Sequence, residues 1–180
     1  MIMADVFAIF GTLLAVGIAL PGLLLTWRLL LPKVVARAEQ RLSHTPWKCF
    51  FGGGAFLIIY LIPVIVLLKL PLPVFKGAGV IALLGLTLVA SVGAAGLAGL
   101  MGQRLNGLGL KSSVGGATVR GAVAMELAAA FPLIGWFIII PITFIIALGA
   151  ALFALTGWQP KAAPSPASPG AQNVTKLAAS

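Results

Sequence analysis

Four long apolar runs constrain this chain more than any other feature of its sequence. They cover residues 6–31, 49–70, 77–101 and 121–155, and almost no charged residue interrupts them. Each run is at least as long as the roughly 20 residues that a helix needs to cross a hydrocarbon core of about 30 Å. Because backbone N–H and C=O groups find no water there, each run has to be helical. The sequence therefore predicts an all-α fold, a polytopic transmembrane helix bundle with about four spans and short interfacial helices.

The composition limits the partners and cofactors that the chain can have. Hydrophobic residues make up 61% of it and charged residues 8%, whereas a soluble domain carries about 25% charged residues. The net charge of +9 comes from basic residues that flank the spans, where such residues meet anionic lipid headgroups. We therefore expect membrane lipids as partners and no nucleic acid. The single cysteine, Cys49, and single histidine, His44, leave no ligand set for a metal or a haem, so no cofactor is expected.

The apolar pattern divides the chain into a membrane domain, 1–158, and a Pro/Ala/Ser-rich tail, 159–180, that we expect to be disordered. At 1.5 Å per residue the fourth run would be about 50 Å long, which is too long for one span. Its prolines favour a break at 132–135 between an amphipathic segment, 119–131, and a span over 136–155. The alternative is a helical hairpin within 121–155, which would return the tail to the opposite side of the membrane.

The distribution of basic residues predicts the orientation. Five of the twelve lysines and arginines surround the first connection, 32–47, and three lie in the third, 102–120. With four crossings these two connections share a side of the membrane, and the positive-inside bias places them in the cytoplasm. The sequence therefore predicts a protein of the bacterial inner membrane with both termini outside.

A basic stripe marks the segment 33–43. Lys33, Arg37 and Arg41 recur at every fourth position, which aligns them on one face of an amphipathic helix. We expect this face to contact lipid headgroups. Glu39, within the same segment, is assigned no role beyond solubility.

The third span carries a stripe of small residues at spacings of three and four. The residues of this stripe are Ser91, Ala95, Gly96, Gly99 and Gly102. Small residues at such spacings let a second helix approach closely, and packing drives association in lipid. We expect the stripe to serve helix packing, either within the chain or between subunits. The alternative, a pore-lining helix, lacks a selectivity filter or a ring of acidic residues.

Glu126 is the candidate polar site, because a carboxylate in an apolar segment is costly to bury. It could carry a proton if it faced the interior of the bundle. Arg120 lies less than two helical turns earlier. The alternative explanation is therefore a Glu126 that snorkels to the membrane interface or pairs with Arg120.

Residues 41–155 resemble a family, the membrane domain of unknown function that follows bactofilin-like polymer-forming repeats in some bacterial proteins. The resemblance rests on TPWKCFFGGGAFLIIYLIPVIVLL, then GLAGLMGQRL, then RGAVAMELAAAFPLIGWFIIIPITFIIALGAALFAL. The chain differs in having an added apolar span, 6–31, where the family has its repeats. The resemblance implies membrane attachment or scaffolding and carries over no catalytic residue.

The sequence holds no catalytic constellation, such as paired carboxylates, a phosphate loop or a Ser/His/Asp set. We therefore expect a non-enzymatic membrane protein, a scaffold or accessory subunit of a larger assembly, including a respiratory or photosynthetic complex. Its partners would be other membrane subunits or further copies of itself. The alternative is a small transporter or channel component with Glu126 as its polar centre.

Overall fold

The computed structural model describes residues 2–109, 113–131 and 133–157, with the backbone alone at 2–5, 9, 10, 13 and 16. The predicted disordered tail, 159–180, lies outside the described residues. The helices are α1 (Ile2–Leu30), α2 (Pro32–His44), α3 (Pro46–Lys69), α4 (Pro73–Gly107), α5 (Val114–Ala129), the π-helix η1 (Gly135–Ile139) and α6 (Ile140–Leu155).

The structure confirms the all-α fold, with long apolar helices and no strand among the described residues. Three helical segments there are long and apolar enough to cross a membrane: Pro46–Lys69, Pro73–Gly107 and Gly135–Leu155. A fourth crossing is reached if Gly17–Leu30 and Pro32–His44 count as one broken span. These helices are those of a multi-pass membrane protein.

The chain turns sharply between α1 and α2, where the helix axes are bent by 109°. Pro32 is the first residue of α2, and Leu31 before it has left the helical region with φ −124° and ψ 55°. A residue that precedes proline is sterically disfavoured in the α conformation, so the helix breaks at this point. The bend folds α2 back over the body of the protein instead of letting it continue α1.

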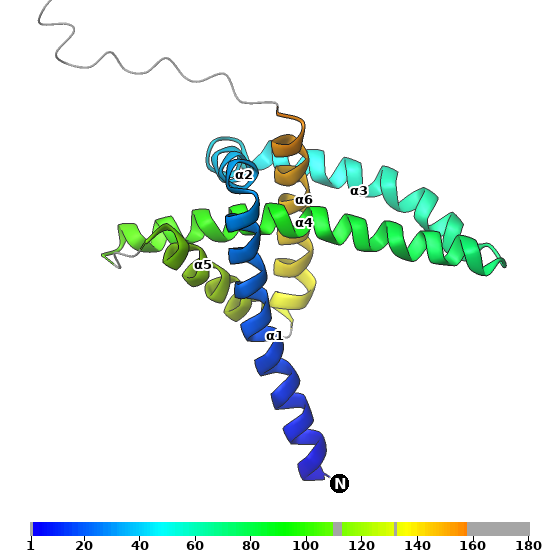
Figure 1. The fold of residues 1–180 in the computed structure, drawn as a ribbon, viewed down its shortest axis with the longest axis horizontal. Helices are drawn as coiled ribbons and strands as arrows, with labels where there is room; N and C mark the ends of the chain where they lie inside the picture. The colour runs from blue at the N-terminus through cyan, green and yellow to red at the C-terminus, as the bar shows by residue number, and fades with distance from the viewer. Residues whose placement is uncertain (1, 110–112, 132, 158–180) are drawn as a thin grey trace, which may run out of the picture.

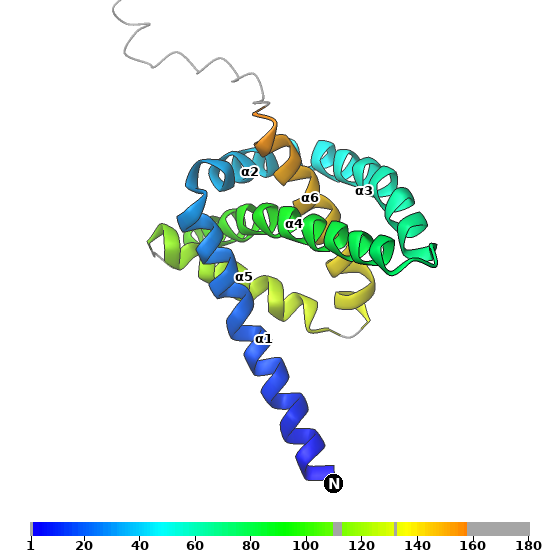
Figure 2. The same ribbon diagram turned by 45° about the vertical axis from the view of Figure 1, so that its right-hand side comes forward.

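Helix α4 is the central element, and the other five described α-helices all pack against it (Figures 1 and 2). With 35 residues it is about 52 Å long, and it extends beyond the predicted span 77–101 at both ends. Helix α3 lies beside it as a hairpin partner, and α5 returns along its C-terminal half. Helices α1 and α6 cross it, and the N-terminal half of α1 projects away from the body.

Glycines bring the backbones into contact at the crossings. An added Cβ on Gly93 of α4 would overlap the backbone carbonyl of Ala147 in α6. The α3–α6 pair is reciprocal, because Gly53 faces the carbonyl of Ile145 and Gly149 faces that of Cys49. No side chain larger than hydrogen fits at these positions. The close approach increases dispersion contacts, which stabilise helix pairs in lipid.

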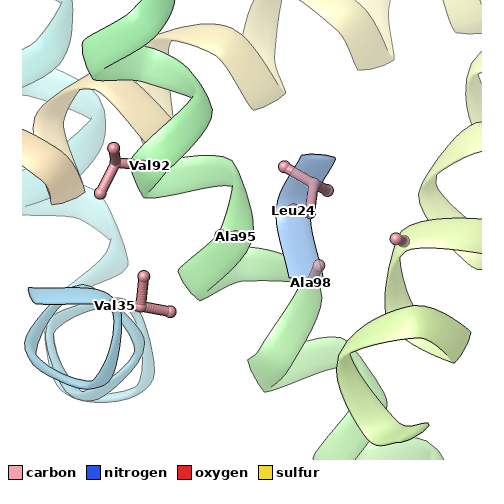
Figure 3. Packing of buried hydrophobic residues seen from close by; sticks show 6 residues of the cluster. Leu24, Val35, Val92, Ala95 and Ala98 are labelled. Atoms are coloured by element: carbon pink, nitrogen blue, oxygen red, sulfur yellow. The ribbon is translucent and has the colours of Figure 1, made fainter. Parts of the chain in front are cut away.

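Small side chains also fill the core around α4. Figure 3 shows Leu24 of α1 and Val35 of α2 gathered around Val92, Ala95 and Ala98 of α4. Ala95, Ala98 and Val35 are fully buried. Four helices therefore meet at this cluster, to which α5 contributes Ala122.

The π-helical turn that opens the η1–α6 segment has its cause in Pro141. Proline lacks an N–H group and cannot donate to the carbonyl four residues earlier. The turn before it is a π-helix, in which the N–H of Ile140 donates to the carbonyl of Gly135, five residues back. Helix α5 ends at Ala129 and η1 begins at Gly135, so the predicted break at 132–135 lies between them.

Candidate functional site

A cavity of about 250 Å³ lies between α1, α4, α5 and the η1–α6 segment. Its walls are almost entirely apolar side chains, including Leu20, Leu24, Ala90, Met125, Phe144 and Ala147. Two hydroxyls of α4 also line it, but each already donates to a carbonyl of its own helix: Thr87 to Leu83 at 2.9 Å and Ser91 to Leu88 at 2.7 Å. Thr143 of α6 adds a third hydroxyl to the lining. The cavity is therefore a mostly apolar surface on which the two α4 hydroxyls are satisfied by their own helix.

Glu126 is the charged residue in the described lining of this cavity. Its Oε1 atom is buried and accepts no hydrogen bond within the described part of the chain. Its Oε2 atom is directed toward α1, where a Cβ on Gly17 would lie 4.0 Å away. Helix α5, which carries Glu126, is too short to count among the spanning helices. Burial raises the pKa of the Glu126 carboxyl above its ordinary value.

Arg120 does not pair with Glu126. The ion pair found among the described residues joins Arg28 and Glu39, and the Arg120 side chain is exposed near the start of α5. The alternative explanation of Glu126 as an arginine-paired carboxylate is therefore wrong. The two residues of the predicted polar site share α5 but form no ion pair with each other.

A second polar cluster joins three helices at the α1–α2 bend. Glu39 of α2 is only 7% exposed and accepts a hydrogen bond from Arg28 Nη1 of α1 at 3.0 Å. Gln103 Nε2 of α4 donates to its other carboxylate oxygen. The cluster ties the bend to the C-terminal half of α4.

Sequence reasoning missed this cluster, because it treated Glu39 as a solvated charge. The signal was nevertheless present: Val35, Ala38, Glu39 and Leu42 follow the i, i+3, i+4, i+7 pattern of one buried helix face. A carboxylate on such a face needs a partner, because a buried unpaired charge is very costly.

The three basic residues of the stripe on α2 differ in how far the folded chain exposes them. Lys33 is exposed and Arg37 is partly exposed, so both remain available to lipid headgroups. Arg41 is 4% exposed, with its guanidinium carbon 5.6 Å from the centre of the Phe153 ring. The expectation of headgroup contact therefore does not hold for Arg41, which packs on α6 because the apolar face of α2 covers the body of the protein.

The small residues of α4 are occupied by neighbouring helices. Gly96 faces Ala38 and Glu39 of α2, Gly99 faces the Arg28–Glu39 pair, and Gly102 faces the backbone of Ala117 in α5. Ala95 is buried in the core and Ser91 lines the cavity. Of the two uses predicted for the stripe, contacts within the chain take up Ala95, Gly96, Gly99 and Gly102, and a second subunit would find these four positions covered.

No group of three or more His, Cys, Asp or Glu residues that could hold a metal ion occurs in the described ranges. Comparisons of the chain with protein-family models, curated proteins and solved structures found no match.

Proposed function

We propose that this protein is a non-enzymatic scaffold or accessory subunit of a larger membrane assembly, in the bacterial inner membrane. The resemblance to the membrane domain of bactofilin-like proteins supports a scaffolding role. The observation that carries the proposal is the projecting half of α1, which extends away from the other described helices (Figures 1 and 2).

The projecting half of α1 has the surface expected of an assembly helix. Large apolar side chains are exposed on it, with Phe7 at 74%, Leu14 at 68% and Ile18 at 69%. Small residues also lie together along this part of α1 and line a shallow groove. These residues are Ala8, Gly11, Thr12, Ala15 and Ala19. An added Cβ on Gly11 meets no atom within 4 Å. Because the small residues of α4 are already covered, this face is the one that supports association with a second membrane helix.

Replacing Gly11 with leucine should therefore reduce assembly without disturbing the fold. Its control is Gly77→Leu on α4, a second exposed glycine whose added Cβ meets nothing within 4 Å. We expect native electrophoresis and light scattering in mild detergent to give a smaller assembly for Gly11→Leu than for Gly77→Leu and the unaltered protein. Equal assembly size for all three proteins would contradict the proposal.

The proposed orientation places the first and third connections in the cytoplasm. It is supported by a contact between them, because Gln103 of the third connection donates to Glu39 of the first. Residues that touch cannot lie on opposite sides of a hydrocarbon core of about 30 Å. The eight basic residues of these connections then place this side in the cytoplasm.

Labelling of single cysteines in intact cells measures the orientation. In a Cys49→Ser background, we expect Arg37→Cys to be shielded from a membrane-impermeant maleimide and Lys76→Cys to react. Both side chains reach the surface of the folded chain, so burial does not account for the difference. Labelling of Arg37→Cys in intact cells would reverse the proposed orientation.

The second candidate function is a small transporter or channel component. It is favoured by one observation, the buried and unpartnered oxygen of Glu126 beside an apolar cavity. In proteoliposomes, a proton- or ion-dependent flux that Glu126→Gln lowers would favour this candidate over the scaffold, and a flux unaltered by the substitution would remove its basis.

A further inference from the structure

An occupant of the cavity beside Glu126 has to match both the cavity's small, mostly apolar volume and its single carboxyl group. The cavity volume of about 250 Å³ lies just below the roughly 300–1,000 Å³ of pockets for drug-sized ligands, so its occupant is small. Its walls come from α1, α4, α5 and α6 and are mostly apolar, with the hydroxyls of Thr87, Ser91 and Thr143 among them, which favours a compact hydrocarbon body. Glu126 adds a single negative charge or a single acidic proton to that surface.

One oxygen of the Glu126 carboxyl group lacks a partner in the described part of the chain. Oε1 of Glu126 is buried without a hydrogen bond among the described residues, and a buried polar atom without a partner is costly. The nearest helix across from it offers Gly17, which has no side chain to donate. The basic residues Arg28, Arg41 and Arg120 are absent from the lining of this cavity.

The possible occupants differ in how they treat this oxygen. A lipid acyl chain fills the apolar volume but leaves Glu126 without a partner, and an anionic ligand is repelled by the carboxylate. A protonated amine with a compact apolar body meets both requirements, because its ammonium donates charge-assisted hydrogen bonds to the carboxylate while its body covers the apolar wall.

We propose that this cavity is a binding site for a small apolar amine, held as its ammonium ion with Glu126 as the counter-ion. The site is independent of the scaffold role, because it lies within one chain and needs no second subunit. Its walls are formed where α1 reaches the α4–α5–α6 body, at the inner end of the projecting half of α1 (Figures 1 and 2).

Binding of adamantylamine to the purified full chain tests the proposal. Equilibrium dialysis against phosphatidylcholine nanodiscs, with empty nanodiscs as reference, should give one saturable site per chain. Adamantanol has the same cage without a charge, and we expect it to show no saturable binding. Glu126→Gln keeps the shape of the side chain and should weaken adamantylamine binding by about 10- to 100-fold, the range expected for a hydrogen bond to a charged group.

A second pair of variants separates loss of the site from loss of the fold. Ala129→Phe fills the cavity, which Ala129 lines, and should abolish binding. Leu127→Phe on the same helix is its control, because Leu127 is exposed and does not line the cavity. Equal binding of adamantanol, unchanged affinity in Glu126→Gln, or uptake equal to that of empty nanodiscs would each overturn the proposal. None of these outcomes bears on assembly through α1, which is measured separately.

Discussion

Gly93→Ala should destabilise the protein by about 3 kcal/mol or more, a large effect for the addition of one methyl group. Overpacking usually costs about 1–3 kcal/mol because flexible side chains give way. Here the methyl group would meet the backbone carbonyl of Ala147, which cannot move unless α6 separates from α4. The free energy of unfolding can be measured by titration with sodium dodecyl sulfate in mild detergent, with circular dichroism as the signal.

Gly85→Ala is the matched control on the same helix. Gly85 is exposed, and an added Cβ meets no atom within 4 Å. Alanine is the better helix former by about 1 kcal/mol, so this substitution should be neutral or slightly stabilising. A loss of stability in Gly85→Ala similar to that in Gly93→Ala would show that the α4–α6 contact is not the cause.

Glu39→Leu should destabilise the protein by about 3–5 kcal/mol, the usual cost of removing one partner from a buried ion pair. It leaves Arg28 with its side chain 15% exposed and without its carboxylate, and it leaves Gln103 without an acceptor. The pair also holds the 109° bend, so α2 should become more mobile. Faster hydrogen exchange in α2 than in α3 would report this loosening.

A double substitution distinguishes the unpaired charge from the lost packing. Arg28→Met with Glu39→Leu removes both charges and should recover much of the lost stability, because a buried ion pair is often no better than apolar residues of similar volume. Gln40→Leu is the control, since Gln40 is the exposed neighbour of Glu39 on α2. If Glu39→Leu unfolded no more easily than Gln40→Leu, the cluster would not stabilise the bend.

Much of the architecture could be predicted from local sequence because its causes are local. Long apolar runs require helices in lipid. Pro32 disfavours the α conformation at the residue before it, and Pro141 removes a backbone donor from the turn that precedes it. The candidate carboxylate, Glu126, could also be singled out, since charge in an apolar segment is visible without a structure.

The partners of these residues were decided by the tertiary structure. Glu39 is paired with Arg28, 11 positions away, and with Gln103, 64 positions away, and no local pattern joins such distant residues. The stripe of small residues on α4 indicated close packing, but only the fold determined that α1, α2 and α5 cover its glycines while the small residues of the projecting half of α1 remain exposed. Helix periodicity in the sequence identifies which face of a helix is buried. Which neighbouring helix covers that face depends on how all the helices of the body pack and cross.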